Sequence, residues 1–79
     1  MRLDKYLKNS RIIKRRTIAN EACDAGRVTV NAKPAKASYE VKVGDIIEIR
    51  FGEKLIKAEV LRIDDNPRKD DAALMYKSL

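Results

Sequence analysis

The sequence predicts a single α+β domain in which two short N-terminal helices pack on a small antiparallel sheet. Apolar residues in the first 25 positions recur with helical spacing. From position 27 onward, β-branched residues alternate with polar ones or run in short stretches between turn residues. The 79 residues contain no internal repeat and no low-complexity linker, so they indicate one unit. We expect a main domain over residues 1–65 and a C-terminal extension over 66–79 that contains a short helix.

The first helix is predicted over residues 2–10 and the second from about 15 or 16 to 25. In the first, i, i+3, i+4 spacing marks one buried face, made of Leu3, Tyr6 and Leu7. In the second, the expected buried stripe is Ile18, Ala19, Ala22 and Cys23. Ile12 and Ile13, in the connection, are expected to turn inward. Gly26 tolerates a left-handed backbone and is expected to end the second helix.

The segment after Gly26 is predicted to be extended. Val28 and Val30 alternate with polar neighbours and lie on one face of a strand, which the turn residues at 31–34 end. A second alternation over Tyr39–Val43 predicts another strand before the Gly44–Asp45 turn.

Two apolar stretches then predict a hairpin. Residues 46–51 form a β-branched and aromatic run, residues 52–54 form its turn, and residues 57–63 form the returning strand. Residues 64–67 end that strand. A last short helix is expected within 70–79, using Ala73, Leu74 and Tyr76.

All of the net charge of +6 lies in the first twenty residues. The other 59 residues carry eleven cations and eleven anions. One small piece of a domain with this charge favours a polyanion, and nucleic acid first of all. The only acid among these twenty residues, Asp4, is expected to stabilise the first turn of the first helix. The candidate RNA-binding residues are the seven cations Arg2, Lys5, Lys8, Arg11, Lys14, Arg15 and Arg16.

The composition argues against catalytic and metal-binding functions. Histidine is absent and Cys23 is the only cysteine, which removes imidazole bases, an intramolecular disulfide and a thiolate metal cage. The acids between positions 64 and 71 have the spacing of no calcium loop. We therefore expect no catalytic residue, no metal and no cofactor. A lone cysteine and the lack of a long apolar stretch predict a cytoplasmic protein with no membrane partner.

Four short motifs together resemble the S4 RNA-binding domain family: Arg2–Leu7, Arg15–Arg16, Gly26–Asn31 and Val41–Asp45. The resemblance spans about residues 1–51. Two departures are visible. Arg15 stands where the family often has a serine that would cap the second helix. Asn31-Ala32 stands where the family commonly has Asn-Gly, which leaves the type of that hairpin turn open.

The resemblance implies a two-helix RNA-binding face. Arg16 matches the most characteristic basic position of the family, at the start of the second helix, and Arg2 is the next strongest candidate. Free-standing members that begin in the same way are factors of bacterial ribosome-associated quality control. Their implied partners are the large ribosomal subunit with its rRNA, peptidyl-tRNA, and the protein RqcH, which directs alanine addition to stalled nascent chains without mRNA. The free protein is expected to be a monomer.

Four alternatives stay open at this point. A heat-shock S4 protein would also bind a blocked large subunit, but is expected to carry a longer basic tail than these charge-balanced last nineteen residues. A helix-turn-helix DNA regulator would need a recognition helix, whereas the second helix turns Asn20, Glu21 and Asp24 outward. A protein adaptor would not need the cationic segment. A membrane-surface helix would carry more apolar area and an aromatic anchor.

Overall fold

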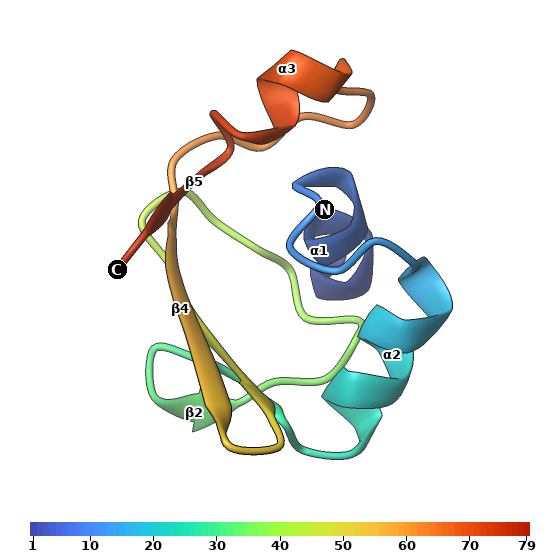
Figure 1. The fold of residues 1–79 in the computed structure, drawn as a ribbon, viewed down its shortest axis with the longest axis vertical. Coiled ribbons are helices and arrows are strands. Elements are labelled where there is room, and N and C mark those ends of the chain that lie inside the picture. Colours follow the sequence, from blue (N-terminus) through green and yellow to red (C-terminus); the bar gives the residue numbers. More distant parts are fainter.

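The computed structural model describes residues 1–79 and has the predicted two-layer α+β arrangement (Figure 1). Two helices cover one face of a five-stranded antiparallel sheet with the strand order β2-β1-β3-β4-β5. No helix is long and apolar enough to cross a membrane. The elements are α1 (Leu3–Asn9), α2 (Arg16–Asp24), β1 (Val28–Val30), β2 (Lys33–Pro34), β3 (Ile46–Phe51), β4 (Lys54–Val60), α3 (Lys69–Ala72) and β5 (Tyr76–Ser78).

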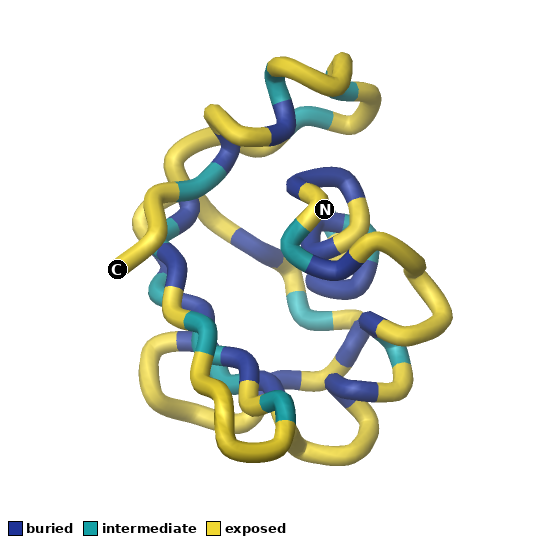
Figure 2. The backbone as a smooth tube through the Cα atoms, in the orientation of Figure 1, coloured by how far each residue is buried: buried dark blue, intermediate teal, exposed yellow.

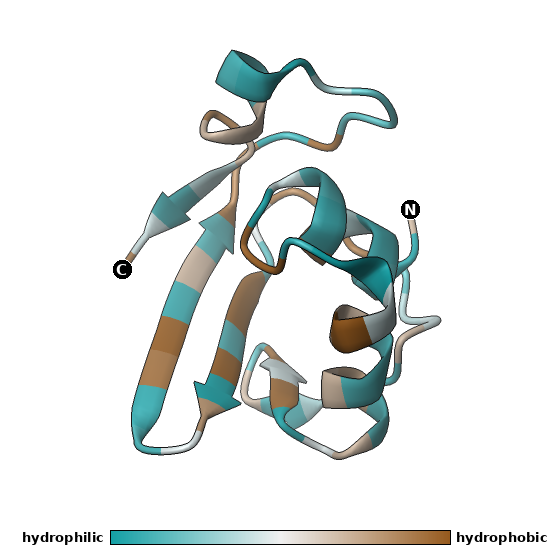
Figure 3. Cartoon of the chain, turned by 45° about the vertical axis from the view of Figure 1, so that its right-hand side comes forward, coloured by the Kyte–Doolittle hydropathy of each residue, from teal (hydrophilic) through white to brown (hydrophobic).

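The core fills the space between α1, α2 and the sheet, as the buried segments in Figure 2 show. Buried residues alternate with more exposed ones along β3 and the second half of β4. The outer sides of the helices are mostly hydrophilic (Figure 3). The predicted inward side chains of α1 are fully buried. In the connection, Ile13 is buried and Ile12 packs against the core, as predicted.

The buried stripe of α2 is narrower than predicted. Ala19, Ala22 and Cys23 are buried, but Ile18 is 45% exposed. The three buried positions form an i, i+3, i+4 row of small side chains, and Ile18 lies one position off that row, in the first helical turn. Burial raises the pKa of the Cys23 thiol to about 11. Gly26 follows with a φ of +74°, as its predicted role at the end of the helix requires.

The first hairpin has a two-residue turn. Asn31 and Ala32 have φ values of 53° and 69°, and Val30 pairs directly with Lys33. Positive φ at both central residues defines a type I′ turn, which settles the turn type that the sequence left open. The prediction that the turn includes Lys33 and Pro34 is therefore wrong, because these two residues form β2.

The predicted strand over Tyr39–Val43 is wrong. The segment has only an isolated bridge, between Glu40 and Arg2, and its backbone bonds join Leu3 N–H to the Tyr39 carbonyl and Val41 N–H to the Met1 carbonyl. The apolar residues of this segment do not form one face of a strand, because Val41 is buried in the core while Val43 is 64% exposed.

The C-terminal part differs most from the prediction. β4 begins at Lys54 and ends at Val60, three residues earlier at each end than predicted. The helix expected within 70–79 is wrong, because α3 spans only Lys69–Ala72 and the chain then forms β5, which pairs with β4. Met75 is fully buried while Leu74 is 57% exposed. The division at residue 65 stays a prediction, although β5 belongs to the same sheet as β1.

Candidate nucleic-acid interface

A buried carboxylate joins the beginnings of α1 and α2. The Asp4 side chain is only 3% exposed, and it accepts hydrogen bonds from Arg2 Nε (3.2 Å), Arg16 Nε (3.4 Å) and Asn20 Nδ2 (3.3 Å). It also accepts the backbone N–H of Lys5 at 2.8 Å, which satisfies one free donor of the first turn of α1. The predicted structural role of Asp4 is thus confirmed and extended to α2.

Asp4 is charged at neutral pH. Burial raises the pKa of its carboxyl, but the hydrogen bonds from Asn20, Arg2 and the Lys5 N–H, together with the Arg16 charge, outweigh burial and hold that pKa below 3.8. Arg2 and Arg16 are each held at Nε, yet about half of each side chain is exposed. The two guanidinium groups are therefore fixed in place with N–H groups left for an anion.

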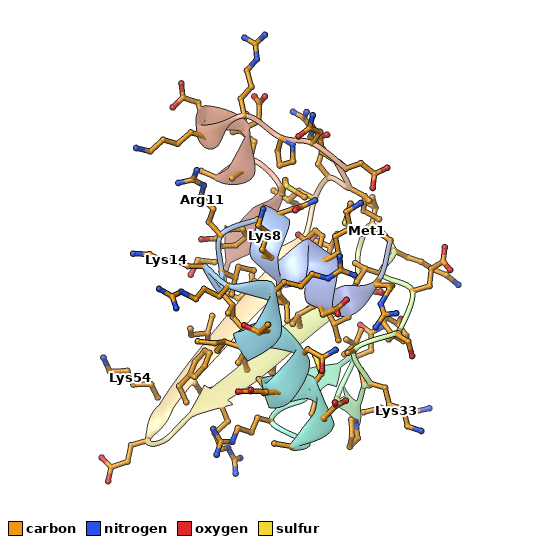
Figure 4. The ribbon with its side chains drawn as sticks, turned by 90° about the vertical axis from the view of Figure 1, so that its right-hand side faces the viewer. Met1, Lys8, Arg11, Lys14, Lys33 and Lys54 are labelled. Carbon is orange, nitrogen blue, oxygen red and sulfur yellow. The ribbon has the colours of Figure 1, made fainter.

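Five of the seven predicted cations line one open groove of about 550 Å³. Figure 4 shows two of them, Arg11 and Lys14, extending to the same side of the molecule, with Lys33 on the opposite side. Apart from one proline, every lining residue is polar or charged: Lys5, Lys8, Asn9, Arg11, Lys14, Arg16, Asp65, Asn66 and Pro67. This surface suits phosphates better than an apolar ligand or a stacked base.

The turn after α1 brings the groove cations together. Ser10 ends the helix, and Arg11 follows with a φ of 63°, a left-handed conformation in which glycine is usual. Arg11 N–H donates to the Lys8 carbonyl at 3.0 Å, and Ile13 N–H donates to the Leu7 carbonyl at 3.0 Å. The chain reverses within these few residues, so the cations of α1 and those before α2 line the same groove.

The opposite wall of the groove comes from the loop after β4. Asn9 is buried, and its side-chain amide nitrogen Nδ2 donates to the backbone carbonyls of Asp64 (3.2 Å) and Asp65 (3.1 Å). Lys5 Nζ lies 3.1 Å from Asp65 Oδ1. Sequence reasoning missed this wall, because its partners are more than 50 positions apart and leave no local pattern.

The two remaining predicted residues lie outside the groove. Arg2 lies beside Asp4, next to Arg16 in space. Arg15 precedes the first turn of α2 and makes no side-chain cap there, as its departure from the family pattern predicted. No group of three or more His, Cys, Asp or Glu side chains is placed to hold a metal ion. RNA contact by each of the seven cations stays a prediction.

Comparison with known proteins gives one family match and several similar chains. Residues 1–47 match the model of the S4 domain. The chain is 58% identical to the RQC P-site tRNA stabilizing factor of Streptococcus pneumoniae, over 98% of this chain and 88% of that one. It is 52% identical to the Bacillus subtilis protein of the same name, over 100% and 92%. The solved trimeric structure of heat shock protein 15 from Vibrio cholerae aligns with a TM-score of 0.91 and 31% identity, covering 100% of this chain and 81% of that one.

Proposed function

The chain belongs to the S4 domain family, and from this premise we propose that it binds RNA through the cationic groove and holds P-site tRNA on the large ribosomal subunit. The groove, with five cations from α1, the connecting turn and the first residue of α2, is the observation that carries the proposal. The relatives named RQC P-site tRNA stabilizing factor support the choice of tRNA, because this chain matches them over nearly its whole length.

The mode of binding follows from the side chains of the site. A-form RNA hides its base edges in a deep, narrow groove and exposes phosphates and ribose hydroxyls. Arg2 and Arg16, held by Asp4 at a fixed spacing, would form charge-assisted hydrogen bonds to phosphates. The groove lysines would add attraction with less directionality, since an ammonium group acts as a point charge. The protein would therefore recognise the shape of a folded RNA more than its sequence.

In the finer form of the proposal, the protein works with RqcH during alanine tailing of stalled nascent chains. It would contact rRNA as well as peptidyl-tRNA and act by binding alone in the cytoplasm, so that peptide-bond chemistry belongs to the ribosome. The absence of histidine supports a role without catalysis. The charge-balanced remainder of the chain supports contact with a protein partner.

The alternatives have less support. As a recognition helix, α2 would present the exposed acids Glu21 and Asp24 to DNA phosphates, which is unfavourable. The heat-shock alternative rests on a relative at 31% identity, against 58% for the stabilizing factor. Retention on duplex DNA and on large subunits at equal salt would separate the two classes of ligand, and a preference for DNA would reverse the assignment.

The test of the proposal is co-sedimentation with large subunits that carry P-site tRNA. Arg16→Ala and Arg2→Ala should abolish association and keep the fold, because both side chains are half exposed. Lys54→Ala, which removes one exposed cation at the far end of the β3–β4 hairpin, is the matched control and should sediment like the wild type. Wild-type sedimentation of both arginine variants would refute the proposal.

Salt dependence gives a second measurement. Each neutralised phosphate lowers log K by about 0.7 to 0.9 for each tenfold rise in salt. If the five groove cations each meet one phosphate, the slope of log K against log salt concentration should be about −3.5 to −4.5. A slope near zero would show that charge does not drive association.

A further inference from the structure

One acid faces the cations across the groove. Asp65 lies on the wall formed by the loop after β4, and its side chain is 81% exposed. Its neighbour Asp64 is already used, because the Asp64 carboxylate accepts bonds from Arg62 (3.3 Å) and from the backbone N–H of Asn66 (3.1 Å). Asp65 has a single partner, Lys5, which meets only its Oδ1. One oxygen of Asp65 is thus available at the groove.

The backbone that carries this carboxylate is held in place by α1. Asn9 holds the backbone carbonyls of both Asp64 and Asp65, and this asparagine is nine-tenths buried. The loop is therefore fastened to α1, so a ligand bound to the cations also meets the acid. A carboxylate repels every phosphate, in DNA and RNA alike. It favours a ligand only where that ligand presents a hydrogen-bond donor.

Nucleic acids offer two kinds of donor, and the groove favours one. Base amines are displayed in the A-form minor groove only at guanines, whereas every nucleotide there presents a 2′-hydroxyl. Bases in unstacked regions expose further amines, but such bases need an aromatic or apolar platform. The groove has no aromatic lining residue. Ribose 2′-hydroxyls lie on the wide minor-groove surface of A-form RNA, beside the phosphates, and act as donors. They alone distinguish RNA from DNA at a given position.

We propose that Asp65 is the specificity-determining residue of the groove and accepts a hydrogen bond from a ribose 2′-hydroxyl while the facing cations bind the adjoining phosphates. The inference rests on the proposed RNA-binding function and adds the chemical group that is read. Lys5, the present partner of Asp65, would turn to a phosphate in the complex. A permanent pairing is not needed for the fold, because an exposed ion pair adds little stability.

The test uses one hairpin sequence made as RNA and as 2′-fluoro RNA. The fluorine keeps the phosphate charge and the A-form but removes the donor. We expect the wild type to bind the ribose hairpin about three- to tenfold more tightly, which is the net effect of one typical hydrogen bond in a solvent-exposed place. Asp65→Ala should bring this ratio to about one.

The matched control is Glu53→Ala, which removes an exposed acid from the β3–β4 turn, outside the groove. This control should keep the wild-type preference. If Asp65→Ala keeps it as well, the inference is refuted while the RNA-binding proposal stands. If the wild type binds neither hairpin, at salt low enough for phosphate contacts to form, both proposals fail. The two failures therefore give different results.

Discussion

Arg11 offers a direct test of how the groove is built, because stability and binding should change in opposite directions there. Its φ of 63° lies in the left-handed region, which costs a residue with a Cβ about 1–2 kcal/mol. Glycine avoids that cost but loses more entropy on folding, by about 0.5–1 kcal/mol. The middle values of these two ranges leave a net gain, so Arg11→Gly should raise the free energy of unfolding by about 0.5–1 kcal/mol.

The matched variant is Arg11→Ala. Both variants remove one groove cation, but only glycine relieves the backbone. In a domain of this size 1 kcal/mol corresponds to a shift of roughly 4–8 °C in Tm. Arg11→Gly should therefore melt roughly 2–8 °C higher than Arg11→Ala. Both should bind large subunits more weakly than the wild type. The slope of log K against log salt concentration should become less negative by about 0.7–0.9.

Thermal melts by circular dichroism and sedimentation at several salt concentrations measure the two effects separately. Equal melting temperatures for the glycine and alanine variants would refute the argument that the turn holds Arg11 at a conformational cost. Binding equal to that of the wild type would remove Arg11 from the groove contacts.

Two further predictions concern the buried polar groups of α1. Asp4→Asn should lower the free energy of unfolding at pH 7 by about 1–3 kcal/mol in urea titrations, because it leaves two arginines without their anion. The folded-state pKa of Asp4 lies below 3.8, so the stability that its carboxylate contributes is present above that pH and is lost as the pH falls. The difference in free energy of unfolding between the wild type and Asp4→Asn should therefore shrink below pH 3.8. A difference that stays constant with pH would contradict the argument. Tyr6→Phe removes the buried bond from the Tyr6 hydroxyl to the Met75 carbonyl, which is 2.7 Å long, and should cost about 0.5–1.5 kcal/mol. Amide exchange in β5 should be faster in this variant, and unchanged exchange would show that the bond does not hold that strand.

Local pattern predicted the N-terminal half of the fold well. The buried face of α1 and the end of α2 at Gly26 depend on spacing within a few residues, which a sequence displays directly. The C-terminal half depended on distant partners. Tyr76 is extended because it pairs with Val60, and Met75 is held in the core where its carbonyl accepts a hydrogen bond from the Tyr6 hydroxyl. Neither partner is visible in the local sequence.

The site was predicted in the same uneven way. Charge counting found all five groove cations, because clustered charge needs no structure to be seen. It gave no reason for Asn9 or Asp65, which matter through a contact between α1 and a loop over 50 positions away. It also treated Asp4 as a local helix acid, whereas the structure makes it the common partner of Arg2 and Arg16.

The two acids near the cations would have different parts in the proposed RNA binding, because their exposure differs. Asp4 is 3% exposed and bonded on several sides, so no phosphate can replace it without unfolding the start of α1. Asp65 is 81% exposed and meets only Lys5, so a phosphate can take over that lysine at little cost. The free protein thus offsets its clustered charge with one permanent anion and one exchangeable anion. RNA would replace only the exchangeable partner, which leaves Arg2 and Arg16 in the same place in the free and bound protein.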